Sequence, residues 1–258
     1  MSLSVIIITK NEEANLQACL ESVRFADQWV VVDSASTDST CAIASAFGAE
    51  VAQTQAWPGF GPQKNLALSL ATQDWVLSLD ADERVTPELA AEIQQAIQRP
   101  AANAFEIPRL TQFCGQWIHH CGWTPDPVLR LFRRGQAAFS NDLVHERVIL
   151  TSGALAPPPM RLKSRLLHYS YPTPMHYWRK LEQYSLAWAE QSHARGKSSS
   201  MPRAVISGLT AFLKSYIFRL GILDGSMGFA VCTMQAQAAF GKYFTLYCLN
   251  QKNAPKKF

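Results

Sequence analysis

The sequence predicts an α/β domain with a mostly parallel central sheet, followed by a helical extension. Apolar, β-branched runs alternate with helical patterns and short connections through about residue 107, which is typical of βαβ units. Acidic residues follow two of the predicted strands, at the end where open α/β sheets bind their ligands. From about residue 174 the apolar residues recur at helical spacing. These three observations place a site in the first part of the chain.

The predicted elements of the first part follow one another closely. Continuous apolar runs predict strands buried on both faces at residues 4–9, 29–33, 50–52 and 75–79. Helices are expected to open at Lys10–Glu13, to run from residues 36–40 to Phe47, and to cover 65–71 and 86–98. Gly48 suits the end of the second helix, and Thr86 followed by Pro87 suits the start of the last one.

The alternation stops after a further strand at 105–107. Residues 108–126 are rich in Trp, His and Gly and are predicted to form a loop, before strands at 128–132 and 146–150. A helix is expected from Pro174, a polar linker at 194–203, an amphipathic helix at 204–220 and an apolar helix at 227–249. We therefore predict a catalytic domain of residues 1–175 and a helical, basic extension of residues 176–258.

The net charge of +4 is distributed unevenly along the chain. Residues 1–194 contain 15 Lys and Arg against 19 Asp and Glu, whereas residues 195–258 contain 9 Lys and Arg against Asp224 alone. A basic, aromatic segment indicates an anionic partner, either membrane lipid or nucleic acid. The sequence has no run of 18 apolar residues and no basic, apolar leader, and its scattered cysteines favour reduced thiols in the cytoplasm.

The stretch VLSLDADERVTP, residues 76–87, concentrates the acids. Asp80, Asp82 and Glu83 follow an apolar strand and precede a helix start. Because like charges repel, a divalent cation bound through oxygen atoms is one explanation, and an acidic, solvated turn is the other. The other motifs of the sequence are needed to choose between a cation site and a solvated turn.

Other polar residues are predicted at the same edge of the sheet. Asp33 ends the second strand, and Lys64 follows the loop PGFGP. A nucleotide diphosphate would use this mixture, with a carboxylate for the base or ribose, a lysine for phosphate and a cation between acids and diphosphate. The alternatives are a capping carboxylate for Asp33 and a solvated surface position for Lys64. The glycine-rich dinucleotide and Walker loops are both absent from the sequence.

The motifs together resemble the family 2 glycosyltransferases, which have a GT-A fold, a Rossmann-like nucleotide-sugar-binding domain. The resemblance rests on TKNEE, VVDSASTDST, QKN, LSLDADE, GWTPDPVLRLFRRG and VHERV, in that order over residues 1 to about 175. LHYSYPT and LGILDGSMGF are similar to segments of bacterial lipopolysaccharide inner-core β-glucosyltransferases. The resemblance implies an inverting, metal-dependent hexosyltransferase, with UDP-glucose as the expected donor and Mg²⁺ or Mn²⁺ as the expected cation.

The resemblance also implies roles for individual residues. The donor-binding residues would be Thr9, Asn11, Glu12, Asp33, Lys64 and Asp80. The metal would be held by Asp82, with Asp80 and His168 as further ligands, although His168 also suits a core histidine bonded to the backbone. The general base would be Glu146, with Asp142 in reserve, because inversion needs a carboxylate near the acceptor hydroxyl.

The acceptor side is predicted from the second half of the chain. Trp123, Asp126 and Arg130 are candidates for acceptor contacts, with core packing, a turn and solvation as their respective alternatives. The helix at 204–220 is expected either to lie in a membrane interface or to pack on the catalytic domain. We therefore expect a lipid-linked saccharide acceptor and a peripheral position on the cytoplasmic face of the inner membrane.

Three rival functions are compatible with parts of the sequence. Transfer to polyprenyl phosphate or to another cell-surface polysaccharide would use the same donor site. A nucleotidyltransferase would open with a glycine-rich, arginine-containing loop, which TKNEE is not. A nucleic-acid-binding protein would use the basic tail but leave the acid cluster unexplained, so we expect no nucleic acid partner.

Overall fold

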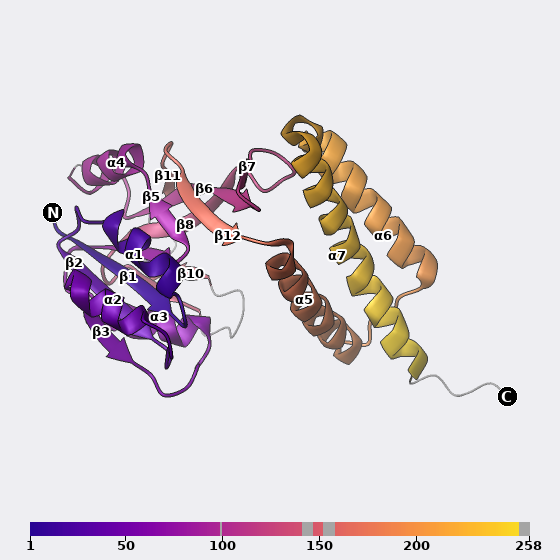
Figure 1. Cartoon of the computed structure of the whole chain (residues 1–258), viewed down its shortest axis with the longest axis horizontal. Coiled ribbons are helices and arrows are strands. Elements are labelled where there is room, and N and C mark those ends of the chain that lie inside the picture. The colour runs from indigo at the N-terminus through magenta and orange to yellow at the C-terminus, as the bar shows by residue number, and fades with distance from the viewer. Residues whose placement is uncertain (99, 141–146, 152–157, 253–258) are drawn as a thin grey trace. The chain divides into compact units, whose positions relative to one another are not determined.

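The computed structural model describes residues 1–98, 100–140, 147–151 and 158–252. The chain forms two compact units, which are Met1–Arg109 with Asp126–His168, and Leu110–Pro125 with Tyr169–Phe258 (Figure 1). The second unit therefore takes in 110–125 and 169–175, which the sequence analysis placed in the catalytic domain. The α/β fold with a helical C-terminal extension is confirmed.

The first unit contains most of a ten-stranded mixed sheet with the order β3-β2-β1-β4-β8-β6-β12-β5. Its strands are β1 (Leu3–Thr9), β2 (Gln28–Asp33), β3 (Glu50–Gln53), β4 (Trp75–Asp80), β5 (Glu83–Val85), β6 (Ala104–Phe113), β7 (Gln116–Ile118), β8 (Asp126–Arg133), β11 (Met160–Arg161) and β12 (Leu166–Tyr171). Strands β9 (Ala137–Phe139) and β10 (Val148–Leu150) form a separate antiparallel pair.

The parallel part of the sheet is the part that the sequence predicted. Strands β3, β2, β1 and β4 run parallel, whereas β8 pairs antiparallel with both β4 and β6. Side chains of β1 alternate between two apolar clusters, because successive residues of a strand point to opposite faces. Val5 and Ile7 pack in one cluster, while Ile6 and Ile8 pack in the other. The continuous apolar run SVIIIT is thus explained by burial on both faces.

Helices cover the two faces of this sheet. The helices of the first unit are α1 (Glu13–Glu21), α2 (Thr40–Phe47), α3 (Phe60–Leu70) and α4 (Pro87–Gln98). Helices α1, α2 and α4 contribute to the cluster of Val5 and Ile7, and α3 contributes Ala67 to the other cluster. Gly48 ends α2 with a φ of 93°, a backbone conformation that glycine adopts without strain.

Helix α3 begins earlier than predicted, at Phe60 instead of Asn65. Gly59 precedes the helix, and Pro62 lies in its first turn, where the missing N–H of proline is not needed for a helical hydrogen bond. The loop PGFGP therefore supplies the first turn of the helix. This earlier start places Lys64 on a helix rather than after a loop.

The prediction of a loop over residues 108–126 is wrong in part. Strand β6 continues to Phe113, and β7 pairs back on it, so only the later residues lack regular structure. The sequence shows no simple alternation there, because the burial of β6 does not follow a period of two. Strand β12, which contains His168, and the short strand β5 after the acid cluster were also not predicted.

The second unit is mainly helical. Its helices are α5 (Pro174–Ala194), α6 (Met201–Leu213) and α7 (Gly225–Lys252). The predicted helix at 204–220 is interrupted, because α6 continues as a π-helical turn (Lys214–Phe218) and then a 3₁₀ turn (Gly221–Asp224). The core of this unit joins the aromatic segment 113–123 to α5 and α7 through Phe113, Ile118, Cys121, Tyr177, Val231, Cys232 and Met234.

Among the described residues, no single helix is long and apolar enough to cross a membrane. Two consecutive segments, Met201–Phe218 and Gly221–Gln251, are long and apolar enough only when they are taken together. They are bent by 75° at the break between them.

Candidate functional site

The carboxyl ends of β2, β1 and β4 lie side by side at one edge of the parallel sheet. In the strand register, Asp33 is opposite Thr9, and Asp80 is opposite Ile8. The two acids therefore flank the end of β1. Acids from separate strands therefore share the end of the sheet where open α/β sheets bind ligands, as the sequence predicts.

The two loops that follow β1 and β2 are joined to each other by hydrogen bonds. The Asn11 side-chain oxygen accepts from the backbone N–H of Thr37 at 2.9 Å, and the backbone N–H of Asn11 donates to Ser36 Oγ at 2.7 Å. The backbone N–H of Glu12 donates to Thr40 Oγ1 at 2.8 Å. Asn11 has a φ of 55°, in the left-handed region that asparagine tolerates better than most residues. The motifs TKNEE and DSASTDST are thus hydrogen-bonded to each other at the carboxyl ends of β1 and β2.

Asp33 is fully buried and accepts three hydrogen bonds. Thr9 Oγ1 donates at 2.9 Å, the backbone N–H of Ser36 donates at 2.8 Å, and Ser36 Oγ donates at 2.5 Å. Burial raises the pKa of Asp33, but the hydrogen bonds from Ser36 and Thr9 outweigh this effect and leave the pKa below its ordinary value. Asp33 is therefore a fixed carboxylate at neutral pH.

Asp80 lies between two buried cationic side chains. Lys64 Nζ is 3.0 Å from Asp80 Oδ1, and an Arg130 guanidinium nitrogen is 2.5 Å from Asp80 Oδ2. Burial raises the pKa of Asp80, but the charges of Arg130 and Lys64 hold it well below its usual range. Lys64 is held in this position by α3, in which the neighbouring side chain of Gln63 donates to Ser34 Oγ at 2.8 Å. The interpretation of Lys64 as a solvated surface lysine is wrong.

Glu83 is the residue of this region whose position the sequence analysis did not anticipate. It has no exposed surface, and its Oε1 is 2.6 Å from Arg130 and 3.5 Å from Arg109. Its Oε2 accepts from the backbone N–H of Asp80 at 2.9 Å. Burial lowers the pKa of Arg130, but the carboxylates of Asp80 and Glu83 raise it above its ordinary value. Glu83 therefore positions Arg130 and the end of β4.

Asp82 and His168 form a second pair at the same edge. His168 Nε2 lies 3.4 Å from Asp82 Oδ2, and both side chains are partly exposed. Within the described ranges, no group of three His, Cys, Asp or Glu side chains is placed to hold a metal ion. A carboxylate and an imidazole nevertheless suit a divalent cation that takes its other ligands from substrate phosphates and water. Asp80, engaged by two cations, does not join this pair.

Glu12 lies within the electrostatic reach of both acids of the motif. Burial raises the pKa of Glu12, and the charges of Asp82, Asp38 and Asp80 raise it further, while a hydrogen bond from Asn15 at 2.9 Å lowers it. The carboxylates of Asp82, Asp38 and Asp80 are therefore close enough to Glu12 to affect its pKa.

The residues predicted to contact the acceptor belong to both units of the chain. Asp126 accepts two hydrogen bonds from Arg109, at 2.5 and 3.0 Å. Trp123 belongs to the second unit, where its ring stacks with Tyr177 at a centroid distance of 6.2 Å. Asp142 and Glu146 lie outside the described residues. The acceptor and base roles of these residues stay predictions.

Comparison with known proteins decides the family. A family model described as glycosyl transferase family 2 matches residues 4–143. The chain belongs to this family. The matched range contains the loops after β1 and β2, the helix of Lys64 and the acids after β4. The family 2 fold of this chain is the predicted GT-A fold.

Relatives of similar length support the assignment to family 2. An uncharacterised glycosyltransferase of Rickettsia typhi is 30% identical over 97% of this chain and 88% of its own length. The lipopolysaccharide core biosynthesis glycosyltransferase LpsC of Rhizobium meliloti is 30% identical over 93% of this chain and 90% of its own length. The crystal structure of S. aureus TarS 1–349 matches with a TM-score of 0.50 at 16% identity, covering 100% of this chain and 94% of that one, which shows the fold.

Proposed function

We propose that this family 2 glycosyltransferase moves glucose from UDP-glucose onto an inner-core sugar of lipopolysaccharide, with inversion at the anomeric carbon. The arrangement of charges at the sheet edge supports the proposal most directly. Asp33 is fixed as a carboxylate, Lys64 and Arg130 flank Asp80, and Asp82 lies beside His168. A nucleotide diphosphate needs this combination of anionic and cationic contacts.

The relatives support the choice of donor and acceptor. TarS, whose fold is similar, has also been crystallised in complex with UDP. LpsC is named for lipopolysaccharide core biosynthesis, and the alignment with it covers nearly the whole of both chains. We extend both properties to this chain as part of the proposal.

Each residue of the edge has a role in the proposed reaction. Asp33 would accept hydrogen bonds from the uracil or ribose, and Lys64 would neutralise phosphate charge while keeping Asp80 ionised. Asp82 and His168 would hold a Mg²⁺ or Mn²⁺ ion, which when bound stabilises negative charge on the departing diphosphate. Glu146, or Asp142 in its place, would remove the proton of the acceptor hydroxyl as it attacks the anomeric carbon.

A panel of UDP-sugars with Mn²⁺ tests the donor and the acceptor together. We expect UDP release from UDP-glucose, and much less from UDP-galactose or UDP-N-acetylglucosamine, when inner-core lipopolysaccharide is present. If UDP were released from UDP-glucose with polyprenyl phosphate instead, the proposed lipopolysaccharide acceptor would be wrong and the proposed donor would be correct. If no UDP-sugar were hydrolysed, and none were protected by the protein, the nucleotide-sugar site itself would be contradicted.

We also propose that the second unit binds the cytoplasmic face of the inner membrane. Apolar side chains of α6 and of the turns that follow it are exposed to a degree unusual for a soluble protein, with Leu209 at 61%, Phe218 at 80% and Leu223 at 64%. Others on the same segment are Val205, Ile206, Leu213, Ile217, Leu220 and Ile222. An apolar surface of this kind can enter the acyl boundary of a bilayer.

The charges around this surface suit anionic lipid. Asp224 is the sole acidic side chain in residues 195–258, and it is turned inward, with only 6% of its side chain exposed. Its carboxylate accepts from the backbone N–H and from Nδ1 of His120, both at 2.8 Å. Lys214 and Arg219 therefore lie on a segment without an opposing exposed carboxylate, and each cation near an anionic surface adds about 1 kcal/mol.

Substitution of Phe218→Ser together with Leu223→Ser tests the membrane proposal. Since burial of each large apolar side chain is worth about 1.5–3 kcal/mol, we expect partitioning into phosphatidylglycerol vesicles to weaken by at least about tenfold in a flotation assay. Leu186→Ser is the matched control, because Leu186 is 45% exposed but lies on α5. Equal flotation of the double variant and the control would contradict the membrane surface.

A further inference from the structure

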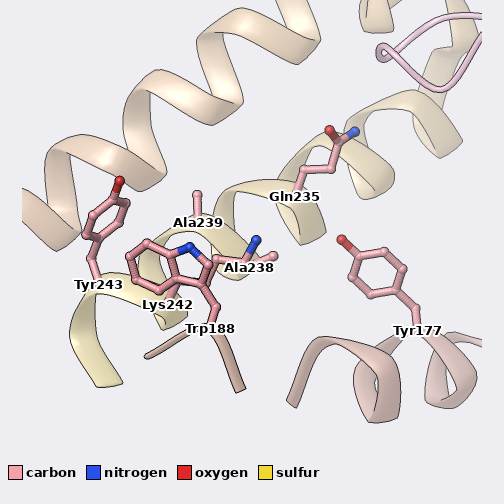
Figure 2. A pocket seen from close by; sticks show the side chains of 7 residues that line it. All are labelled: Tyr177, Trp188, Gln235, Ala238, Ala239, Lys242 and Tyr243. Carbon is pink, nitrogen blue, oxygen red and sulfur yellow. The ribbon is translucent and has the colours of Figure 1, made fainter. Parts of the chain in front are cut away.

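A pocket of about 410 Å³ lies within the second unit, between α5 and α7 (Figure 2). It is lined by Tyr177, Trp188, Gln235, Ala238, Ala239, Lys242 and Tyr243. Its volume is within the range of about 300–1,000 Å³ that is common for small-molecule sites. All its residues belong to the second unit, so this pocket is formed without any residue of the donor site described above.

The spacing of the lining residues explains why the hollow exists. Gln235, Ala238, Ala239 and Lys242 recur at i, i+3, i+4 and i+7, so they lie on one face of α7. The two alanines leave space in the middle of this face, while longer polar side chains stand at its ends. Aromatic residues border the space, since Tyr177 and Trp188 come from α5 and Tyr243 comes from the next position of α7.

The aromatic rings of the pocket are held in defined orientations. Trp188 and Tyr243 meet edge to face with a centroid distance of 5.0 Å and an interplanar angle of 67°. The guanidinium of Arg203, on α6, lies 5.1 Å from the centre of the Tyr243 ring. Such rings offer flat, apolar faces, and Trp188 adds an indole N–H to the lining of the pocket.

The polar groups of the pocket are available to a ligand. Figure 2 shows the Lys242 amine, the Trp188 indole nitrogen and the Tyr177 hydroxyl directed toward the space between α5 and α7. Among the described residues, Lys242 has no carboxylate partner, and the amide nitrogen of Gln235 donates to the carbonyl of Cys121 at 3.2 Å, which leaves the amide oxygen as an acceptor. The pocket therefore offers the ammonium group of Lys242 and several neutral hydrogen-bonding groups.

We propose that this pocket binds a phosphorylated saccharide. The aromatic faces match the C–H faces of a sugar ring, the neutral polar groups match its hydroxyls, and the ammonium of Lys242 matches a phosphate. An acyl chain would leave these polar groups without partners, at a cost in free energy. The inference goes beyond the proposed function, because binding here requires neither the donor nor the transfer step.

A titration of the full chain with glucose 6-phosphate tests the pocket directly. The indole N–H signal of Trp188, assigned in ¹⁵N spectra with a Trp188→Phe variant, is expected to shift and saturate. Glucose and inorganic phosphate are each expected to bind at least about tenfold more weakly, because each provides only half of the contacts. An absent shift with glucose 6-phosphate, or an equal shift with inorganic phosphate or UDP, would overturn the proposal.

The Lys242→Gln substitution separates the contribution of the Lys242 charge to binding from the contribution of the aromatic rings. We expect the dissociation constant for glucose 6-phosphate to rise about tenfold to a hundredfold, while that for glucose is unchanged. Lys197→Gln is the matched control, since Lys197 is an exposed lysine of the same unit that does not line the pocket. Unchanged affinity in Lys242→Gln, with both variants folded by circular dichroism, would overturn the role of the ammonium.

Vesicles distinguish a saccharide phosphate from a lipid headgroup phosphate. Lys242→Gln is expected to float with phosphatidylglycerol vesicles as the unsubstituted protein does, because these lipids contain no sugar ring for Trp188. Loss of flotation in this variant would assign Lys242 to lipid headgroups and would contradict the saccharide site. The binding of glucose 6-phosphate does not depend on the outcome of the UDP-sugar panel. The saccharide pocket and the proposed glycosyl transfer can therefore be contradicted independently.

Discussion

Asp82→Asn is expected to reduce glycosyl transfer by about 10²–10³-fold and to remove the dependence of UDP binding on Mn²⁺. The carboxylate of Asp82 is the acid at the sheet edge that pairs with His168, while both oxygens of Asp80 are engaged by Lys64 and Arg130. The substitution keeps the size of the side chain but removes a charged oxygen. Loss of one electrostatic contact to the developing charge has an effect of this order in other enzymes. Calorimetric titration with UDP, with and without Mn²⁺, measures binding separately from transfer.

Two further variants make the result specific. Asp74→Asn removes a carboxylate just before the amino end of β4 and is expected to leave transfer unchanged. The Asp74 carboxylate accepts from the backbone N–H and the hydroxyl of Ser2, both at 3.2 Å, and β4 separates it from Asp80. Glu146→Gln is expected to lose transfer but keep Mn²⁺-dependent UDP binding, as the proposed base. If Asp82→Asn retained metal-dependent binding, the pairing of Asp82 with His168 would have no role in holding a cation.

The parts of the fold that were predicted correctly depend on local sequence. The run SVIIIT forms a strand buried on both faces, Gly48 ends α2, and Thr86 Oγ1 accepts from the backbone N–H of Leu89 at the start of α4. Each of these features is set by residues within a few positions of one another. The start of α3 was misplaced because Pro62, which suits a loop, is equally compatible with the first turn of a helix.

The parts of the site that were missed depend on contacts between distant residues. The acids after β4 were expected to share one ion, yet Glu83 is buried against Arg130 and Arg109. These arginines lie on β8 and β6, which the sequence does not place opposite the acid cluster. Similarly, Asp224 was counted as the lone acid of a basic tail, but its carboxylate binds the backbone of His120 far away in sequence. The alternation of apolar and polar residues and the capping residues of helices do not indicate such contacts between distant residues.

Glu83→Gln is expected to destabilise the first unit by about 3–5 kcal/mol. Glu83 has no exposed surface and accepts from Arg130, Arg109 and the backbone N–H of Asp80. Glutamine has nearly the same shape, but its amide NH₂ replaces an acceptor with a donor, and the charge opposite two arginines is lost. Removing one partner of a buried ion pair commonly has a cost of this order. In this variant Arg130 keeps Asp80 and Arg109 keeps Asp126, but both lose the buried carboxylate that they share. Hydrogen exchange at the amides of β4 measures the change in the free energy of opening.

The second unit provides an internal control for this measurement. Every hydrogen bond of Glu83 described above is made within the first unit, so exchange at the amides of α7 is expected to stay unchanged. A Glu83→Gln/Arg130→Met double variant is expected to recover part of the loss, because it removes the buried arginine that the single variant leaves with Asp80 as its remaining carboxylate. A loss below about 1 kcal/mol in the single variant would mean that Arg130 is compensated by Asp80 alone. Asp80, rather than Glu83, would then set the position of Arg130 at the edge of the sheet.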